Sequence, residues 1–447
     1  RDQPRSRGLG DVYKRQLFIL FTGLLISFNL NSQSVDFEKY TLENGLDVIL
    51  HKDNSAPVIT TSVMYHIGAK DENPEKTGFA HFFEHLLFEG SKNIERGQWD
   101  IYVNSNGGRY NANTTADRTY YYVVFPSNNL ELSLWLESER MLHPIINQIG
   151  IDTQKEVVKE EKRRGENRPY AKLFDEIQKA LFKVHPYKGT VIGEMEHLSS
   201  ATFEDFEAFN KKFHIPNNAV LVVAGDIEIE KTKVLIEDYF GEIKKGNAVT
   251  RNLPKETPIT ETIYKEAFDE NIQIPASILA YRTPSMKSRE SRVLDMISTY
   301  LSGGQSSVLY KKLVDKKKMA LQVIAANNAQ EDYGIYFIGG LPLGDVELNV
   351  LNEEIDEEIE KLKSELISDR DFQKIQNIYE SQYINSNSTV EGIANSLARY
   401  HTLYGDVDLI NNEIDIYRSI TREEIQDVAQ KYLNKNQRLE LKYLPKK

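Results

Sequence analysis

The sequence has no cysteine among its 447 residues, and this absence removes several kinds of site. Disulfide bonds, a thiol nucleophile, cysteine-type zinc sites and a lipid-modified cysteine anchor are all excluded. Stability must therefore come from the burial of apolar side chains, and hydrophobic residues make up 40% of the chain. A chain of this length is too long for one ordinary core, so we expect more than one domain.

Positive charge is also scarce. Lysine and arginine total 55 against 67 aspartate and glutamate residues, which gives a net charge of −12. A nucleic-acid partner requires a basic face, so the composition argues against nucleic-acid binding. Long apolar runs are missing after the N-terminal region, and we therefore expect no membrane anchor.

One short apolar run does occur, from Leu17 to Phe28, after two basic residues. It is followed by the small-residue pattern Ser32-Gln33-Ser34, and these are the parts of a secretory signal. The run is shorter than the ~20 apolar residues that span a bilayer, and the alternative interpretation is a buried first helix. We expect residues 1–34 to be a leader and signal peptide, cleaved near Val35, and the product to be exported to the periplasm.

Strand and helix patterns mix freely after residue 35. Asn44-Gly45 lies between two strand-like segments and predicts a two-residue hairpin. Residues 58–67 and 119–125 are rich in β-branched and aromatic side chains, which is typical of strands.

One helix-turn-strand stretch occurs twice. Thr202-Phe-Glu-Asp205 and Thr421-Arg-Glu-Glu424 are both capping boxes, and each opens a helix that precedes an asparagine and an apolar strand. The offset is 219 residues at the caps (421 − 202) and at the asparagines (436 − 217). A polar stretch with two prolines, Gly246 to Pro258, indicates a linker between the copies.

We therefore predict an α+β fold of two similar halves, each a mostly antiparallel sheet covered by helices. The N-terminal half, residues 35–247, is expected to carry the metal site. The C-terminal half, residues 258–447, is expected to lack metal ligands, because Asp295 to Leu301 contains no histidine.

The first half contains a candidate metal motif. His81 and His85 are four residues apart, so on a helix both side chains can reach one ion. Glu84 lies close enough to hold a water that the metal activates. Histidine nitrogen suits zinc, and a catalytic zinc takes three protein ligands and keeps one position for water. The alternative, two histidines on a solvated helix face, fits poorly with the apolar residues around them.

The third ligand should be a distant histidine or carboxylate. We expect a helix over Gln154 to Arg164, with Val157 and Val158 on its buried side. Glu161 is four and three residues from these valines, so it should face inward with them, whereas Glu160 is rotated away. We select Glu161.

These motifs together resemble the pitrilysin/insulinase family of inverzincin peptidases, and most closely its bacterial branch akin to mitochondrial processing peptidase. The likeness runs from about Val35 to the C-terminus and is stronger in the first half. The segments that carry it are Asn44-Gly45-Leu46, Gly78-Phe79-Ala80-His81-Phe82-Phe83-Glu84-His85, Asn111-Ala112-Asn113-Thr114, Val157-Val158-Lys159-Glu160-Glu161 and Asn217-Asn218-Ala219.

The resemblance implies one zinc ion per chain, held by His81, His85 and Glu161, with Glu84 as the general base. It also implies paired halves that close, with a second pair, around a chamber for unfolded peptides. In such enzymes the substrate adds a strand to an edge strand near the zinc. The resemblance places that substrate-binding edge at Asn111, Ala112, Asn113 and Thr114.

Two departures from the family pattern bear on the mechanism. Gln154 stands where members often carry a glutamate. Val314 and Leu321 stand where the second half usually supplies an arginine and a tyrosine that hold the substrate carbonyl. Neither can donate a hydrogen bond to a developing oxyanion, a loss typically worth ~3 kcal/mol. We therefore expect a homologous partner subunit with the Arg/Tyr pair, or a homodimer, to complete the site, with Lys316 to Lys318 as the alternative donors.

The sequence thus predicts a zinc-dependent endopeptidase subunit that hydrolyses unfolded peptides through a zinc-activated water. The alternative function is a non-catalytic binding or assembly subunit of a peptidase-like complex. A merely structural zinc is a weaker hypothesis, because structural sites usually have four protein ligands.

Overall fold

The structure is a computed structural model that describes residues 34–446. The chain from Phe37 onward forms one compact unit. The predicted leader and signal peptide lie, but for Ser34, outside the described residues. Within the described part of the chain, no helix is both long and apolar enough to cross a membrane.

The N-terminal half is built on a six-stranded sheet in the order β1-β2-β6-β3-β5-β4. All neighbouring strands are antiparallel except β2 and β6. The strands are β1 (Glu38–Thr41), β2 (Asp47–Lys52), β3 (Val58–Tyr65), β4 (Arg109–Thr114), β5 (Thr119–Pro126) and β6 (Ala219–Gly225).

The hairpin between β1 and β2 forms, but the prediction of a two-residue turn is wrong. Thr41 pairs with Asp47, so residues 42–46 form a five-residue connection. The Asn44 side chain is buried and donates to the carbonyl of Phe240, while Gly45 takes a φ of +86°. Asn44 thus connects the turn to the C-terminal end of helix α9 (Ile229–Phe240).

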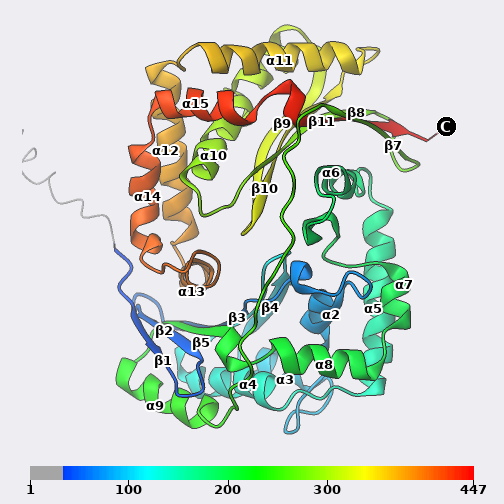
Figure 1. Ribbon diagram of the computed structural model, residues 1–447. Helices are drawn as coiled ribbons and strands as arrows, with labels where there is room; N and C mark the ends of the chain where they lie inside the picture. The colour runs from blue at the N-terminus through cyan, green and yellow to red at the C-terminus, as the bar shows by residue number, and fades with distance from the viewer. Residues whose placement is uncertain (1–33, 447) are drawn as a thin grey trace, which may run out of the picture. The chain divides into compact units, whose positions relative to one another are not determined.

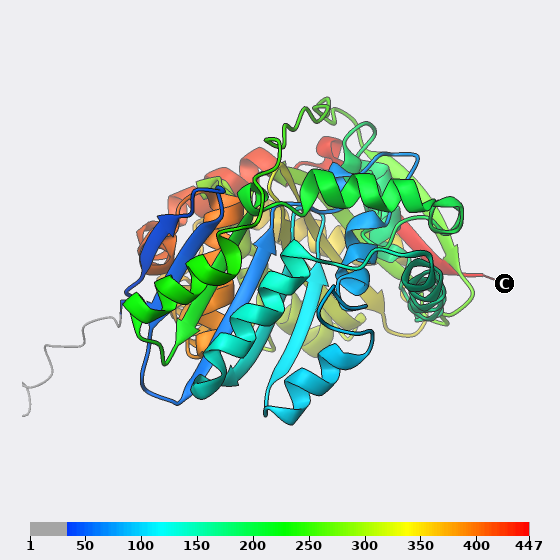
Figure 2. The same cartoon turned by 90° about the horizontal axis from the view of Figure 1, so that it is seen from below.

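Helices cover one face of this sheet, and Figure 2 looks onto them from below. Helices α4 and α9 pack together, and α4 contacts β3 and β5. Apolar side chains from alternate strand positions, such as Val63, Tyr121 and Leu221, form the core beneath them. The helices of this half are α2 (Phe79–Leu86), α3 (Gln98–Ser105), α4 (Leu130–Leu142), α5 (Gln148–Glu166), α6 (Leu173–Leu181), α7 (Met195–Ser200), α8 (Phe203–Phe213) and α9 (Ile229–Phe240).

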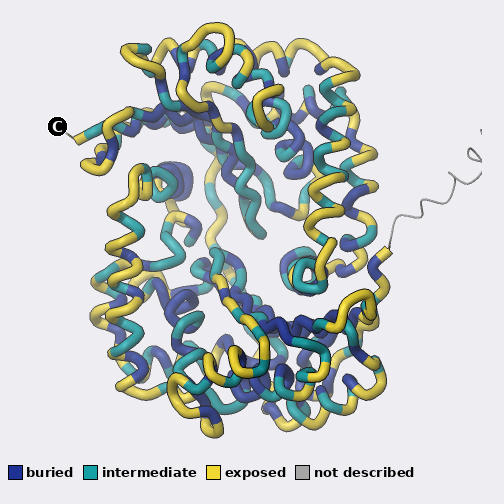
Figure 3. Tube along the Cα trace, turned by 180° about the vertical axis from the view of Figure 1, so that it is seen from behind, coloured by how far each residue is buried: buried dark blue, intermediate teal, exposed yellow. Residues whose placement is uncertain are grey.

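The C-terminal half repeats this plan with a five-stranded sheet in the order β7-β11-β8-β10-β9, where only β7 and β11 are parallel. Its strands are β7 (Ile263–Asp269), β8 (Ala276–Pro284), β9 (Ala320–Ala329), β10 (Tyr333–Pro342) and β11 (Arg438–Pro445). Its helices are α10 (Arg289–Ser302), α11 (Leu348–Ser364), α12 (Asp369–Ser386), α13 (Val390–Arg399), α14 (Leu409–Ser419) and α15 (Arg422–Tyr432). The most buried segments follow the two sheets (Figure 3).

The predicted fold class, α+β with two similar halves, is confirmed. Helices α8 and α15 repeat with the predicted offset at both of their ends. Helix α8 spans Phe203–Phe213 and α15 spans Arg422–Tyr432, so both ends are offset by 219 residues (422 − 203 and 432 − 213). Both predicted capping boxes form. Between Phe240 and Ile263 the chain has no helix or strand, at the place where we predict the boundary between the halves.

Each half lends one helix to the other half's sheet (Figure 1). Helix α6 packs on β7, β8 and β11 of the second sheet, where Ile177 and Leu181 join the buried cluster of Ile278 and Leu439. Helix α13 packs on β3 and β6 of the first sheet. The two helices occupy equivalent places in the repeat, because Leu173 plus the offset of 219 gives position 392, inside α13. Both sheets are therefore covered on their second face by the opposite half.

Candidate metal centre

Helix α2 is fixed at its N-terminus by a buried carboxylate. Glu72 accepts hydrogen bonds from the backbone N–H groups of Gly78 and Ala80, both at 2.7 Å. Burial raises the pKa of Glu72 to about 8, while these N–H donors lower it. Gly78 has a φ of +92°, and a Cβ there would meet the carbonyl oxygen of Ile192 at 2.6 Å, so only glycine fits. Glu72 could not be predicted from the sequence, because no spacing rule connects it with the motif.

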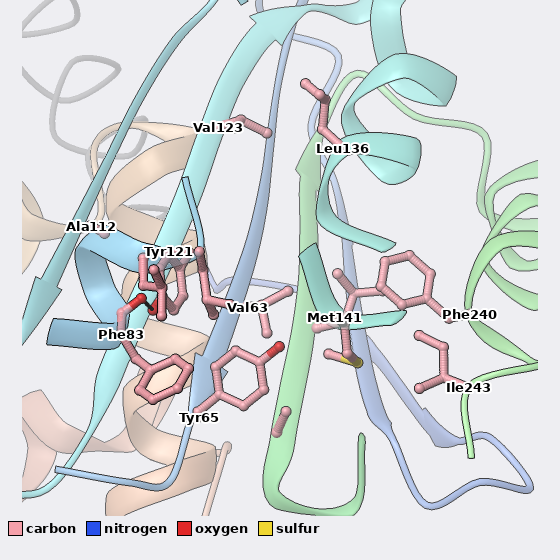
Figure 4. Close-up of a cluster of buried hydrophobic side chains, with 14 of the residues drawn as sticks. Val63, Tyr65, Phe83, Ala112, Tyr121, Val123, Leu136, Met141, Phe240 and Ile243 are labelled. Carbon is pink, nitrogen blue, oxygen red and sulfur yellow. Dashed lines mark hydrogen bonds between the residues drawn. The ribbon is translucent and has the colours of Figure 1, made fainter. Parts of the chain in front are cut away.

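The apolar faces of α2 hold the helix in the core of the N-terminal half. Phe79 stacks on Phe206 of α8 with ring centroids 4.8 Å apart, and Phe83 stacks on Phe209 at 5.3 Å. On the sheet side, the Tyr121 hydroxyl donates to the Phe83 carbonyl at 2.9 Å (Figure 4). The helix is thus clamped between an aromatic layer and the sheet, which fixes the direction of its polar side chains.

The predicted ligands His81, His85 and Glu161 converge at one point. Glu161 Oε2 lies 3.6 Å from His81 Nε2 and 3.3 Å from His85 Nε2. One ligand atom from each of the three residues lies within 4.8 Å of the others. Burial, followed by the neighbouring His85, lowers the pKa of His81 to about 4, so its imidazole is neutral at pH 7. Neutral imidazole is the form that binds metals.

The prediction for helix α5 is partly wrong. Val158 is fully buried, but Val157 is 44% exposed and lies on the open side of the helix. The helix is also longer than predicted, because Asn147 caps it and it continues to Glu166. Glu161 itself is exposed, since one side of α5 borders an open cavity and not the core. Its carboxylate nevertheless reaches the two histidines, and Glu160 turns away to pair with Arg164 at 3.0 Å.

The carboxylate of Glu84 is held from the edge of the sheet. Thr114 Oγ1 donates to Glu84 Oε2 at 2.6 Å. Burial raises the pKa of Glu84 above its ordinary value, and the hydrogen bond from Thr114 lowers it in part. One carboxylate oxygen is therefore engaged, and among residues 34–446 the other oxygen has no hydrogen-bond partner.

Strand β4 carries the four residues predicted to bind substrate. In the described part of the chain it is the last strand of its sheet, and its one partner strand there is β5. Ala112 is buried, whereas Asn111 and Asn113 are exposed. Within residues 34–446 no second strand pairs with β4, as predicted for an edge strand, although the Ala112 N–H donates to Asn111 Oδ1 at 2.9 Å.

A cavity of about 1110 Å³ opens beside the ligands. Its lining includes His85, Glu161 and further residues of α5, and it continues to Asp175 and Ile192. This volume exceeds the upper range of small-molecule pockets, which is about 1,000 Å³, and could accommodate an extended peptide segment.

The residues present fit a zinc ion. Two imidazole nitrogens and one carboxylate are the ligand set typical of catalytic zinc, which keeps one position open. Within residues 34–446, the cluster contains no fourth histidine or carboxylate ligand at similar distance. A closed structural site would need one.

The C-terminal half offers no hydrogen-bond donor at the two positions where the resemblance expects one. Val314 packs against the core of its own half, and the side chain of Leu321 on β9 is 46% exposed. In the neighbouring lysine run, Lys317 pairs with Glu354 at 2.5 Å. That pairing is typical of a solvated face.

Comparison with known proteins identifies the family. A profile described as "Insulinase (Peptidase family M16)" matches residues 47–194, and one described as "Peptidase M16 inactive domain" matches residues 200–379. The chain belongs to peptidase family M16. The first profile includes the motif of His81 to His85, and the second begins within the N-terminal half and extends into the C-terminal half.

Two relatives and one solved structure illustrate the M16 likeness. The zinc protease PqqE of Helicobacter pylori is 29% identical, with 94% of this chain and 95% of that protein covered. A probable mitochondrial-processing peptidase subunit beta of Arabidopsis thaliana is 23% identical, over 86% of this chain and 73% of that protein. The crystal structure of a protease from Helicobacter pylori superposes with a TM-score of 0.86 at 27% identity, covering 92% of this chain and all of that chain.

Proposed function

We propose that this protein is the zinc-bearing subunit of an endopeptidase that hydrolyses unfolded peptides. The observation that carries the proposal is the convergence of His81, His85 and Glu161 on one point. Glu84 lies on α2, the helix that also carries the two histidines. The relatives named zinc proteases support the same chemistry.

In the proposed reaction, His81, His85 and Glu161 would hold the ion. A bound zinc supplies an acidified water near neutral pH and polarises the substrate carbonyl. Glu84 accepts a proton from the attacking water on the oxygen that Thr114 leaves free, and then passes it to the departing amine. The aromatic packing around α2 keeps this carboxylate at a fixed place beside the ligands.

The substrate class follows from the open edge of β4. An extended peptide can add to this edge through main-chain hydrogen bonds, which carry little side-chain selectivity. A folded protein cannot present such a strand, so unfolded segments are the expected substrates. The cavity beside Glu161 receives the side chains next to the scissile bond.

The site is expected to be completed by a partner. Val314 and Leu321 offer no donor to the substrate carbonyl, so we expect a homologous subunit with an arginine and a tyrosine, or a homodimer, to complete the site. The Arabidopsis relative is itself named as a subunit, which supports a paired assembly. The apolar segment Leu17 to Phe28 supports export, and we place the assembly in the periplasm.

A second candidate function is a binding or assembly subunit without turnover. One observation favours it: the profile that matches residues 200–379 is described as an inactive domain. The intact ligand set of the other half favours catalysis.

The test is cleavage of a quenched, unstructured peptide by the purified, zinc-loaded protein, alongside Glu84→Gln. We expect the variant to keep zinc and to lose turnover by a factor of about 100 or more, the usual contribution of a general base. Unchanged turnover in Glu84→Gln would overturn the assignment of Glu84. Cleavage by the chain alone would remove the need for a partner, and no cleavage by a folded, zinc-loaded chain would require one.

A further inference from the structure

A buried lysine joins the two halves close to the candidate active site. Lys70, in a 3₁₀ turn of residues Ala69–Asp71, is only 2% exposed. Its ammonium lies 3.0 Å from Asp117 of the N-terminal half and 2.7 and 3.2 Å from Glu331 and Asp332 of the C-terminal half. A charge removed from water in this way is costly unless it is paired, so these carboxylates are required.

The C-terminal partners lie at the tip between β9 and β10, and the tip is held by its main chain as well. The backbone N–H of Glu331 donates to Asp117 Oδ2 at 3.0 Å. The backbone N–H of Asp332 donates to the Tyr187 hydroxyl at 3.1 Å, and that hydroxyl donates to Asp117 Oδ1 at 2.5 Å. We call residues 330–332 the hairpin tip. Asp117 therefore receives donors from both halves.

Asp117 belongs to the turn of residues 115–118, which connects the edge strand β4 to β5. This turn is fastened to the lysine turn by two backbone bonds, Ala69 N–H to the Thr115 carbonyl and Lys70 N–H to the Ala116 carbonyl. The approach is so close that a Cβ on Gly68 would meet the Ala116 carbonyl oxygen at 2.4 Å. The two turns can only move together.

Both ends of the 115–118 turn lead to the candidate active site. At its start, Thr114 donates to the carboxylate of Glu84 at 2.6 Å. At its end, the Arg118 guanidinium donates to the Asn113 carbonyl of the edge strand at 2.7 Å. The position of this turn therefore determines the position of the Glu84 carboxylate and that of strand β4, where substrate is proposed to bind.

We propose that the hairpin tip of the metal-free half is a positioning element for the active site. Glu331, through Lys70 and Asp117, holds the 115–118 turn in the place where Thr114 meets Glu84. The effect on turnover rests on the proposed peptidase function, whereas the ordering of the turn does not. The C-terminal half thus contributes to the site without supplying a ligand.

The first test measures backbone order by amide hydrogen exchange in Glu331→Ala, with the milder Glu331→Gln beside it. The matched control is Glu176→Ala, which removes the ion pair of Glu176 on α6 with Lys265 on β7. That pair, at 2.5 Å, also joins the two halves but shares no residue with the 115–118 turn.

We expect exchange in residues 111–118 to accelerate about tenfold in Glu331→Ala, since losing a buried partner promotes local opening. Glu331→Gln, which keeps an acceptor for Lys70, should give a smaller increase, and Glu176→Ala none in this segment. Unchanged exchange there, or an equal increase over the whole chain, would overturn the proposal.

The second test separates kcat from KM in the zinc-loaded protein. Glu331→Ala should lower kcat about tenfold with zinc content unchanged, because a shift of about 1 Å in a catalytic group can cost up to a hundredfold. Glu176→Ala should retain the kcat of the wild type. An unchanged kcat beside accelerated exchange would refute positioning. If the chain alone cleaves nothing, as expected when a partner must complete the site, the exchange result decides the proposal by itself.

Discussion

The two halves place a helix at the same point of the repeat, and they use it differently. Helix α2 follows β3 and carries His81, Glu84 and His85, whose polar atoms point toward Glu161 and the edge strand. Helix α10 follows β8 and carries Asp295, which accepts hydrogen bonds from Asn327 at 2.9 Å and Tyr417 at 2.8 Å.

Glu161, the proposed third ligand, shows the same contrast. The repeat offset relates Glu161 on α5 to Glu380 on α12 (380 − 161 is 219). Glu380 pairs with Arg418 of its own half, whereas the carboxylate of Glu161 lies against His81 and His85 and, within residues 34–446, has no ion pair with a lysine or an arginine. One half neutralises its polar groups internally, and the other leaves them available for an ion. A metal site in this fold therefore requires polar side chains that are not already paired with other groups of the protein.

The largest expected effect is on zinc retention. Glu161→Gln should weaken zinc binding by more than about 100-fold, which exceeds the effect usual for outer-shell partners, because it removes a charged ligand. The counterpart Glu380→Gln loses an exposed ion pair and should leave zinc content at one ion per chain. Metal analysis after dialysis compares the two directly. If both variants kept zinc equally, the contrast between the halves would fail.

An intermediate effect is expected from the buried carboxyl of the metal-free half. Burial raises the pKa of Asp295 from 3.8 to about 6, although its two hydrogen bonds lower it in part. Ionisation therefore costs the folded state free energy, and this cost develops as the pH rises from about 4 to about 6. Asp295→Asn cannot ionise, so it should avoid this cost. The cost is up to about 3 kcal/mol of unfolding free energy, because the pKa is raised by about two units.

Chemical denaturation at pH 4.5 and 7.5 checks this prediction. The free energy of unfolding of the wild type should fall, relative to that of Asp295→Asn, as the pH is raised. A difference between the two proteins that stayed constant with pH would show that Asp295 does not titrate in this range.

The smallest expected effect is on the stability of two equivalent helices, and it tests how similar the two halves are. Thr202→Ala and Thr421→Ala each remove a capping hydroxyl from equivalent helices, and each should cost about 1 kcal/mol. The neighbouring carboxylates, Asp205 and Glu424, are each also held by one cation, Lys76 and Arg289 respectively. The two losses, measured by thermal unfolding, should therefore agree within about 0.5 kcal/mol. A clear inequality would mean that the repeat is conserved in geometry but not in energy.

Local signals in the sequence predicted the parts of this molecule that depend on neighbouring residues. Both capping boxes form because the Thr and the acid lie within one helical turn of each other. The spacing of His81 and His85 sufficed to bring their rings together, with centroids 4.9 Å apart. The β-branched and aromatic residues 119–125 form strand β5, in which Tyr121 enters the core.

Features set by distant contacts could not be predicted in this way. Val157 was predicted to be buried from its spacing alone, but the cavity beside α5 leaves it exposed. Glu72 binds the N-terminus of α2 from a loop, and no periodic pattern connects the two. Lys70 meets partners 261 and 262 residues away along the chain, which only the folded structure reveals.

The exchange of α6 and α13 between the sheets has a consequence for how such a chain could arise. In either half alone, the second face of the sheet would be uncovered, because the helix that covers it belongs to the other half. The half's own α6 or α13 would in turn have no sheet to pack on. Two copies of such a half could associate by domain swapping, in which each copy places its helix on the sheet of the other. The present chain has the arrangement of such a swapped pair, joined by a linker, and a cut in that linker would leave the two pieces interlocked.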